Sequence, residues 1–182
     1  MAQYDQNLNL YVLDAADADP FLVPEVDGAA SVIGDGRDNT ISGNSSPNSL
    51  EGGEGNDILR GFDGDDSLKG GDGTDYLYGG LGNDTYYVDD QSDYVFDTYD
   101  GGSDLIIASV SLFIHDLDVE DLLLTGTADI NGHGNEGNNQ ITGSDGDNFL
   151  LGYEGSDWAV TPWTAASAQT EWPAGRRHLL HQ

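Results

Sequence analysis

A nine-residue repeat is the strongest constraint that this sequence places on its fold. Broken every nine residues, the stretch 52–87 reads GGEGNDILR, GFDGDDSLK, GGDGTDYLY and GGLGNDTYY. We number the positions one to nine in this register. The same register extends back over 34–51 and forward over 88–96, and it resumes over 134–160. Such a repeat predicts a solenoid, because each unit can bury its apolar side chain only against its neighbours.

Two columns of the repeat carry one kind of side chain each. Position eight holds a large apolar residue in the first block: Ile41, Leu50, Leu59, Leu68, Leu77, Tyr86 and Val95. Position six holds aspartate or asparagine: Asn39, Asn48, Asp57, Asp66, Asp75, Asp84 and Asp93, then Asn139, Asn148 and Asp157. Glycine at positions one, two and four predicts a turn over the first six positions. The last three positions predict a short strand whose middle residue faces the core.

Turn, strand, turn and strand make one coil of two repeats, so repeats two apart should stack. One edge of the stack, which we call ladder A, would then carry Asn39, Asp57, Asp75 and Asp93. The other edge, ladder B, would carry Asn48, Asp66 and Asp84. Two stacked turns offer two carboxylates and several backbone carbonyls around one gap, an all-oxygen set of about six ligands that suits Ca²⁺. The set offers no imidazole or thiolate, and therefore suits zinc and other transition metals poorly.

The composition explains why a cation is needed. The chain has 34 Asp and Glu against 5 Lys and Arg, a net charge of −29, which argues against nucleic acid and anionic membrane surfaces as partners. One Leu-sized side chain per repeat contributes roughly 2–3 kcal/mol on burial. Ordering nine residues of backbone costs on the order of 9–18 kcal/mol. We therefore expect bound calcium to supply stability that the chain lacks by itself.

The repeats resemble those of the RTX, or haemolysin-type, calcium-binding family, with the pattern G-G-x-G-x-D-x-U-x. GGEGNDILR, GGDGTDYLY and GGLGNDTYY follow this pattern, with Tyr86 as an aromatic variant at U, and GFDGDDSLK departs from it only at Phe62. The resemblance implies an all-β parallel roll (β-solenoid) with calcium between stacked turns. It also implies a fragment of a larger bacterial protein, exported by a type I system to the extracellular space.

The family's metal ligands carry over onto matching positions of this chain. The resemblance assigns the carboxylate ligands to position six: Asp57, Asp66, Asp75, Asp84 and Asp93. It assigns carbonyl ligands to turn glycines: Gly53, Gly55, Gly64, Gly71, Gly73, Gly80 and Gly82. Asn39, Asn48, Asn139 and Asn148 depart from the pattern and would form weaker sites with a neutral oxygen. Asp157 belongs to the same column, although no intact turn follows it.

The domain organisation follows the repeats. We expect an N-terminal lead-in or cap over 1–24, a first repeat block over 25–100 and an apolar spacer over 101–133 that continues the solenoid. A second block is expected over 134–160. The residues 161–182 lack the repeat and are expected to be a disordered or foreign tail, apart from the roll.

The function predicted from these patterns is a non-catalytic module that folds on binding several Ca²⁺ ions outside the cell. The sequence has no H-E-x-x-H and no G-x-S-x-G motif, so no protease or hydrolase signature accompanies the repeats. One alternative is an accessory substrate-binding module of a secreted polysaccharide-modifying enzyme, with outward Tyr76, Tyr78 and Tyr87 as a sugar-stacking platform. Another alternative is a segment of a cell-surface adhesin.

Overall fold

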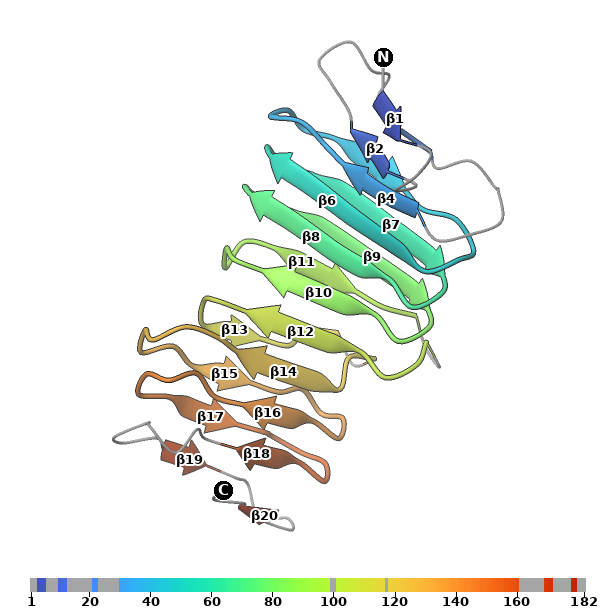
Figure 1. The fold of residues 1–182 in the computed structure, drawn as a ribbon. Coiled ribbons are helices and arrows are strands. Elements are labelled where there is room, and N and C mark those ends of the chain that lie inside the picture. The colour runs from blue at the N-terminus through green and yellow to red at the C-terminus, as the bar shows by residue number, and fades with distance from the viewer. Residues whose placement is uncertain are drawn as a thin grey trace. The chain divides into compact units, whose positions relative to one another are not determined.

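The computed structural model describes residues 3–5, 10–12, 21–22, 30–98, 101–116, 118–160, 169–171 and 178–179. The chain divides into two compact units, Met1–Gly102 and Ser103–Gln182 (Figure 1). Within the described ranges the regular structure consists of β-strands, and no helix is long and apolar enough to span a membrane. The predicted all-β parallel roll is confirmed.

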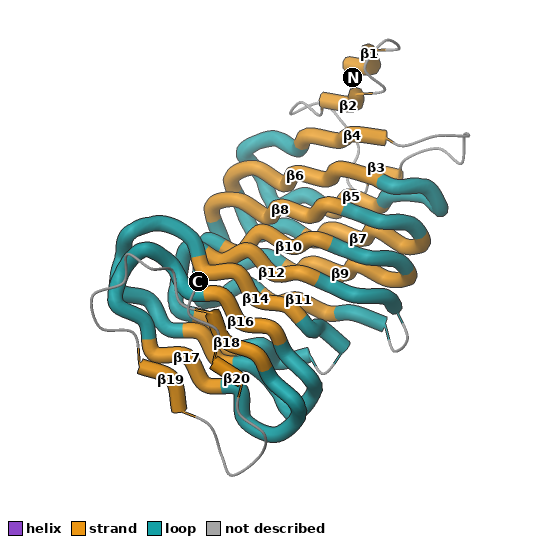
Figure 2. Tube along the Cα trace, turned by 60° about the horizontal axis from the view of Figure 1, so that its bottom comes forward, coloured by secondary structure: helices purple, strands orange, loops and turns teal. Residues whose placement is uncertain are grey.

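The first unit stacks its strands in two layers. One layer runs in the order β1 (Gln3–Asp5), β2 (Leu10–Val12), β4 (Ala30–Ile33), β6 (Asn48–Glu54), β8 (Ser67–Asp72) and β10 (Thr85–Val88). The other runs in the order β11 (Tyr94–Phe96), β9 (Tyr76–Leu81), β7 (Ile58–Asp63), β5 (Thr40–Ser42) and β3 (Phe21–Leu22). Loops join the layers at both edges of the unit (Figure 2). Strand β2 pairs antiparallel with β1 and parallel with β4.

The register of the first unit is the expected step of two repeats. Leu50 pairs with Leu68 in one layer, and Leu59 pairs with Leu77 in the other. Position eight forms the core: Ile41, Leu50, Leu59, Leu68, Leu77 and Tyr86 are at most 1% exposed, whereas Val95 in β11 is half-buried. Positions seven and nine are more exposed than position eight in these strands, as the alternation of a half-buried strand requires.

The strands of the glycine-rich repeats are longer than predicted. We expected three residues, at positions seven to nine, but β7, β8 and β9 each run for six residues into position three of the next repeat. The pairing skips position one and resumes at positions two and three, where Gly53 lies beside Gly71 and Phe62 beside Gly80. Because stacked turns have the same conformation, their positive-φ residues still lie in register, and the strand continues around the bend.

The second unit repeats this architecture with less regular spacing. Its layers are β12 (Leu105–Ala108), β14 (Asp121–Leu124), β16 (Gln140–Thr142), β18 (Trp158–Val160) and β20 (His178–Leu179), and β13 (Leu112–Phe113), β15 (Gly132–His133), β17 (Phe149–Leu151) and β19 (Gln169–Glu171). The spacer strands β12 and β14 pair in parallel and bury Ile106, Ala108, Leu122 and Leu124.

The expected tail meets the second unit at two short strands. Strand β19 pairs with β17, and β20 pairs with β18, both in parallel. The structure thus places these five residues beside the solenoid, and not apart from it as expected. The other residues of 161–182, and most of the 1–24 lead-in, lie outside the described residues, so the origin of the tail stays a prediction.

Candidate metal centre

The position-six side chains of the first unit form two buried ladders, one along each edge. All seven, from Asn39 to Asp93, are at most 8% exposed. In ladder A, the backbone N–H of Asn39 donates to Oδ1 of Asp57 at 2.7 Å, and that of Asp57 donates to Oδ1 of Asp75 at 2.7 Å. The N–H of Asp75 donates in turn to Oδ1 of Asp93 at 3.1 Å. Each carboxylate is therefore held in place by the turn stacked on it.

Ladder B repeats this geometry on the opposite edge. The N–H of Asn48 donates to Oδ1 of Asp66, and the N–H of Asp66 donates to Oδ1 of Asp84, both at 2.7 Å. The spacing predicted this separation into two edges, and the hydrogen bonds of both ladders join residues 18 apart.

The second carboxylate oxygen is in a different situation. Among the described residues, Oδ2 of Asp66 and Oδ2 of Asp75 are buried with no hydrogen-bond partner. A buried polar atom without a partner costs roughly 1–3 kcal/mol, and more where it carries charge. The same feature occurs in two consecutive repeats, one on each edge, and it indicates a ligand site in each ladder, since buried polar groups in proteins are normally satisfied.

The glycine at position one leaves room for this oxygen. A Cβ at Gly61 would collide with Oδ2 of Asp66 and would lie 2.8 Å from the carbonyl oxygen of Gly79. A Cβ at Gly70 would likewise collide with Oδ2 of Asp75. Carboxylate and carbonyl oxygens therefore flank the space beside a residue that has no side chain, which makes an oxygen-lined cradle.

Burial makes the negative charge of these carboxylates unfavourable. Desolvation, helped by the neighbouring Asp84 and Asp65 carboxylates, raises the pKa of Asp66 to about 7. Desolvation and the Asp93 and Asp57 carboxylates likewise raise the pKa of Asp75 to about 7, and burial raises that of Asp84 to about 6. Burial also raises the pKa values of Asp93 and Asp157. A cation placed among these groups would reverse the effect, because opposite charge favours the ionised form.

The predicted glycines occupy the turns as expected. All seven have positive φ, between 104° and 143°: Gly53, Gly55, Gly64, Gly71, Gly73, Gly80 and Gly82. Close approach matters as much as φ, since a Cβ at Gly71 would collide with the carbonyl oxygen of Gly53. Phe62 adopts φ 81° at the equivalent of Gly53, so the stacked repeats impose the conformation on a residue that disfavours it.

The remaining predicted residues lie at the ends of the ladders or in the second unit. Asn39 and Asn48 begin ladders A and B, and their side-chain amides form hydrogen bonds within their own turns. Asp157 accepts the N–H of Asn139 at 3.0 Å, the same bond that joins the ladder residues of the first unit.

One acidic residue near the ladders was missed by the repeat pattern. The carboxylates of Asp84 and Asp97 have oxygens within 4.8 Å of each other, and the Asp97 charge adds to the raised pKa of Asp84. Asp97 Oδ1 also accepts the N–H of Gly80 at 3.2 Å. Asp97 follows Asp84 by 13 residues, so a search at nine-residue spacing cannot find it.

The donor set of both ladders consists of carboxylate and carbonyl oxygens. The chain has no cysteine, so no thiolate can take part. An oxygen-only set with several ligands suits a hard cation, and the flexible coordination of calcium fits it better than the strict octahedron of magnesium. The residues present thus fit Ca²⁺, which would neutralise the buried carboxylates and bridge stacked turns.

A family model for the RTX calcium-binding nonapeptide repeat matches four copies, over residues 33–61, 60–95 and 133–159. The chain belongs to the RTX calcium-binding repeat family. Repeats of this family bind Ca²⁺, so the chain is a calcium-binding β-roll module. A search of curated proteins and a search of solved structures found no match.

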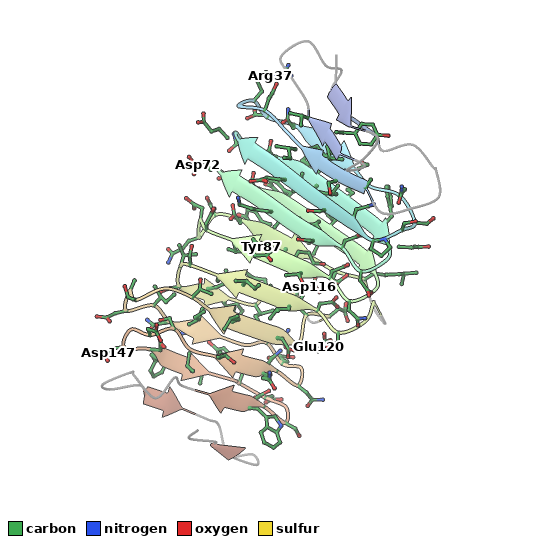
Figure 3. All side chains as sticks on the ribbon, viewed as in Figure 1. Arg37, Asp72, Tyr87, Asp116, Glu120 and Asp147 are labelled. Atoms are coloured by element: carbon green, nitrogen blue, oxygen red, sulfur yellow. The ribbon has the colours of Figure 1, made fainter. Side chains whose placement is uncertain are left out.

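The outward aromatic side chains of this RTX roll stack on one another. Tyr76 lies against Tyr94 with ring centroids 5.1 Å apart, and Tyr78 lies against Phe96 at 4.8 Å. The guanidinium of Arg60 lies 5.3 Å from the centre of the Tyr78 ring. Ring faces that cover each other are not open for a sugar, so the proposed platform is not favoured. Tyr87 belongs to β10, on the other layer, and is 39% exposed (Figure 3).

Proposed function

We propose that this chain is a non-catalytic module that folds on binding calcium after export from a bacterial cell by the type I route. The observation that carries the proposal is the buried, unpartnered Oδ2 of Asp66 and of Asp75 in an oxygen-lined cradle. Without a cation these atoms oppose folding, and with one they would hold stacked turns together. The RTX family, typical of secreted bacterial proteins, supports the extracellular location, where calcium is abundant.

The ligands proposed are the position-six aspartates Asp57, Asp66, Asp75, Asp84 and Asp93, together with carbonyl oxygens of the turn glycines. In Asp66 and in Asp75, Oδ1 orients the carboxylate by accepting a backbone N–H, and the buried Oδ2 is left for the ion. The ion supplies positive charge that offsets the repulsion between carboxylates. Asp157 is proposed as a further ligand in the second unit.

Far-UV circular dichroism tests the proposal. In excess chelator the full chain should give a largely coil-like spectrum, because the aspartate-rich first repeat block loses its order, and millimolar Ca²⁺ should convert it to a β spectrum. Mg²⁺ should be much less effective because it demands a near-ideal octahedron. A complete β spectrum in chelator would contradict calcium-driven folding.

A pair of variants tests the ligands. Asp75→Ala should weaken calcium affinity at least tenfold by calorimetry, because Asp75 lies between Asp57 and Asp93 in ladder A. Asp118→Ala removes a carboxylate of the spacer, outside both ladders, and should leave the affinity unchanged. Equal affinities for these two variants would contradict the assigned ligands.

A further inference from the structure

Apart from the turn 88–93, the described nonapeptide turns are of two kinds, distinguished at positions two and six together. Where position six is Asp66, Asp75 or another aspartate of 52–84, position two has positive φ, as at Phe62 and Gly71. Tyr153, with φ 61°, precedes Asp157 in the same way. In the turns 34–39, 43–48 and 134–139, position six is asparagine and position two is a polar side chain: Asp35, Asn44 and Asn135. None of these three is among the described residues with positive φ.

In the asparagine turns the amide oxygen is used within the turn. Oδ1 of Asn39 accepts the N–H of Asp35 at 2.9 Å, and Oδ1 of Asn48 accepts that of Asn44 at 2.7 Å. Oδ1 of Asn139 accepts the N–H of Asn135 at 2.8 Å. The amide oxygens that could have served an ion thus hold the turn closed.

The side chain at position two completes the closure. Oδ1 of Asp35, Asn44 and Asn135 accepts the N–H of position four at 3.1, 2.9 and 2.7 Å, respectively. In the first two turns it also accepts from the amide of position six, since Nδ2 of Asn39 lies 3.3 Å from Asp35 and Nδ2 of Asn48 lies 3.2 Å from Asn44. Glycine has no side chain, so the turns with glycine at position two cannot make these bonds.

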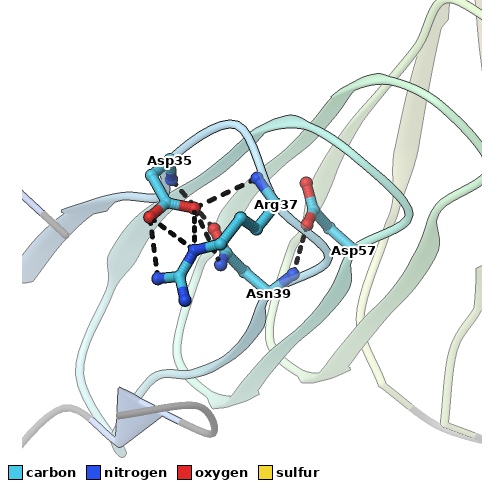
Figure 4. A network of polar contacts seen from close by, with 4 residues as sticks. All are labelled: Asp35, Arg37, Asn39 and Asp57. Carbon is cyan, nitrogen blue, oxygen red and sulfur yellow. Dashed lines mark hydrogen bonds and ion pairs between the residues drawn. The ribbon is translucent and has the colours of Figure 1, made fainter. Parts of the chain in front are cut away.

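In these turns, N–H groups and one guanidinium supply positive charge to the side-chain oxygens, as a bound ion would. Arg37 forms an ion pair with Asp35 at 2.8 Å beside Asn39 (Figure 4), and its hydrogen bonds hold the pKa of Asp35 below the ordinary value. In the second unit, Nδ2 of Asn139 donates to the carbonyl oxygens of Val119 and Glu120 at 3.2 and 3.1 Å. Nδ2 of Asn135 donates to the carbonyl oxygen of Asp116 at 2.6 Å. A calcium ion could reach these carbonyls only by displacing the amides.

We infer that the turns 34–39, 43–48 and 134–139 are closed by their own side chains and take no calcium, so that ions load only the aspartate turns. The inference rests on the proposed function, because it divides the repeats of a calcium-binding roll into ion-dependent and ion-independent ones. Asn39, Asn48 and Asn139 are then structural amides and not weak calcium ligands. The turn 143–148 is left out of this group. There Nδ2 of Asn148 donates to Ile130 O and Ser144 Oγ, but its buried Oδ1 has no partner among the described residues.

Calcium binding by matched variants of the full chain tests this division. Asn48→Ala and Asp66→Asn alter successive members of ladder B. The number of bound ions, measured by equilibrium dialysis, should fall by at least one for Asp66→Asn, or the affinity at that step should fall at least tenfold. Asn48→Ala should keep the wild-type number of ions and an affinity within twofold, although the turn loses hydrogen bonds. Asn139→Ala, in the other unit, should behave in the same way.

The outcomes separate this inference from the proposed function. Loss of an ion from Asn48→Ala or Asn139→Ala, in protein shown to be folded by circular dichroism in saturating calcium, would overturn the inference and leave calcium binding intact. Absence of bound calcium in the wild type would overturn the proposed function and the inference with it. The two asparagine variants lie in different units, so the test stands if one of them does not fold.

Discussion

At the scale of single residues, the two carboxylate oxygens of Asp66, and likewise those of Asp75, have different roles. Oδ1 accepts a backbone N–H from the stacked turn, a bond that favours the ionised form. Burial opposes ionisation more strongly, so the pKa values of Asp66 and Asp75 are raised to about 7 in the absence of an ion. These residues are therefore held ready for a cation at the cost of being unfavourable without one.

Because these carboxylates are unfavourable when ionised, we predict that low pH partly substitutes for calcium in stabilising the fold. The pKa values of Asp66, Asp75 and Asp84 in the roll, about 7, 7 and 6, lie above the ordinary 3.8. A raised folded-state pKa stabilises the fold at low pH, and this contribution is lost as the pH rises through 6 to 7. In chelator, the full chain should show more β structure by circular dichroism at pH 5 than at pH 8. Calcium affinity should fall as the pH is lowered through the same range, because protons compete with the ion for Oδ2. A chelated spectrum that does not change between these pH values would contradict the raised pKa values.

The residue scale also shows where the sequence stops being informative. Aspartate and asparagine at position six both offer an oxygen, so the sequence predicts strong and weak versions of one site. The difference depends on where the amide nitrogen points. For Asn139 this is set by carbonyls of Val119 and Glu120, about 20 residues earlier, in a spacer without the repeat. No spacing rule within the nonapeptide contains that information.

At the scale of strands and turns, the repeat predicted the architecture but not the strand lengths. The position-eight side chains predicted the core and the pairing of residues 18 apart. One large side chain per repeat can be buried only when repeats two apart stack on each other. The six-residue length of β7, β8 and β9 depends on pairing across a bend, and glycine content alone predicted a break there. Phe62 at φ 81° shows that stacking, and not local preference, determines the conformation of position two.

Two glycine variants test this view of the turns. Gly71→Ala should lower the free energy of unfolding in saturating calcium by about 2 kcal/mol or more, because φ is 104° and a Cβ would collide with Gly53 O. Gly36→Ala is the control, since φ is not positive there and the nearest atom, Oε2 of Glu54, lies 3.6 Å from the added Cβ. Its cost should stay within about 0.5 kcal/mol. Urea unfolding at a fixed calcium concentration measures both, and equal losses would contradict the need for glycine at residue 71.

At the scale of the whole molecule, the two units differ in how many carboxylates they bury at position six. The first unit has five such aspartates, Asp57, Asp66, Asp75, Asp84 and Asp93, and the second has Asp157. The second unit instead has amides that donate to backbone carbonyls, and a core that includes Ile106, Leu122, Leu124, Ile141 and Leu150. The sequence predicts weaker calcium sites at Asn139 and Asn148 of the second unit, whereas the bonding predicts no calcium in the turn 134–139.

Hydrogen exchange on the full chain in excess chelator should reveal this difference. In the first unit, backbone N–H groups of β7 to β9, including Tyr76, which donates to Asp57 O at 2.8 Å, should exchange rapidly, because the ladder repulsion is no longer offset. In the second unit, Gln140, which donates to Glu120 O at 3.0 Å, should stay protected, since its turn is closed by Asn135 and Asn139. Added calcium should raise protection at least a hundredfold in β7 to β9 and less than tenfold in β14 and β16. Equal gains in both units would mean that the asparagine turns depend on calcium as strongly as the aspartate turns do.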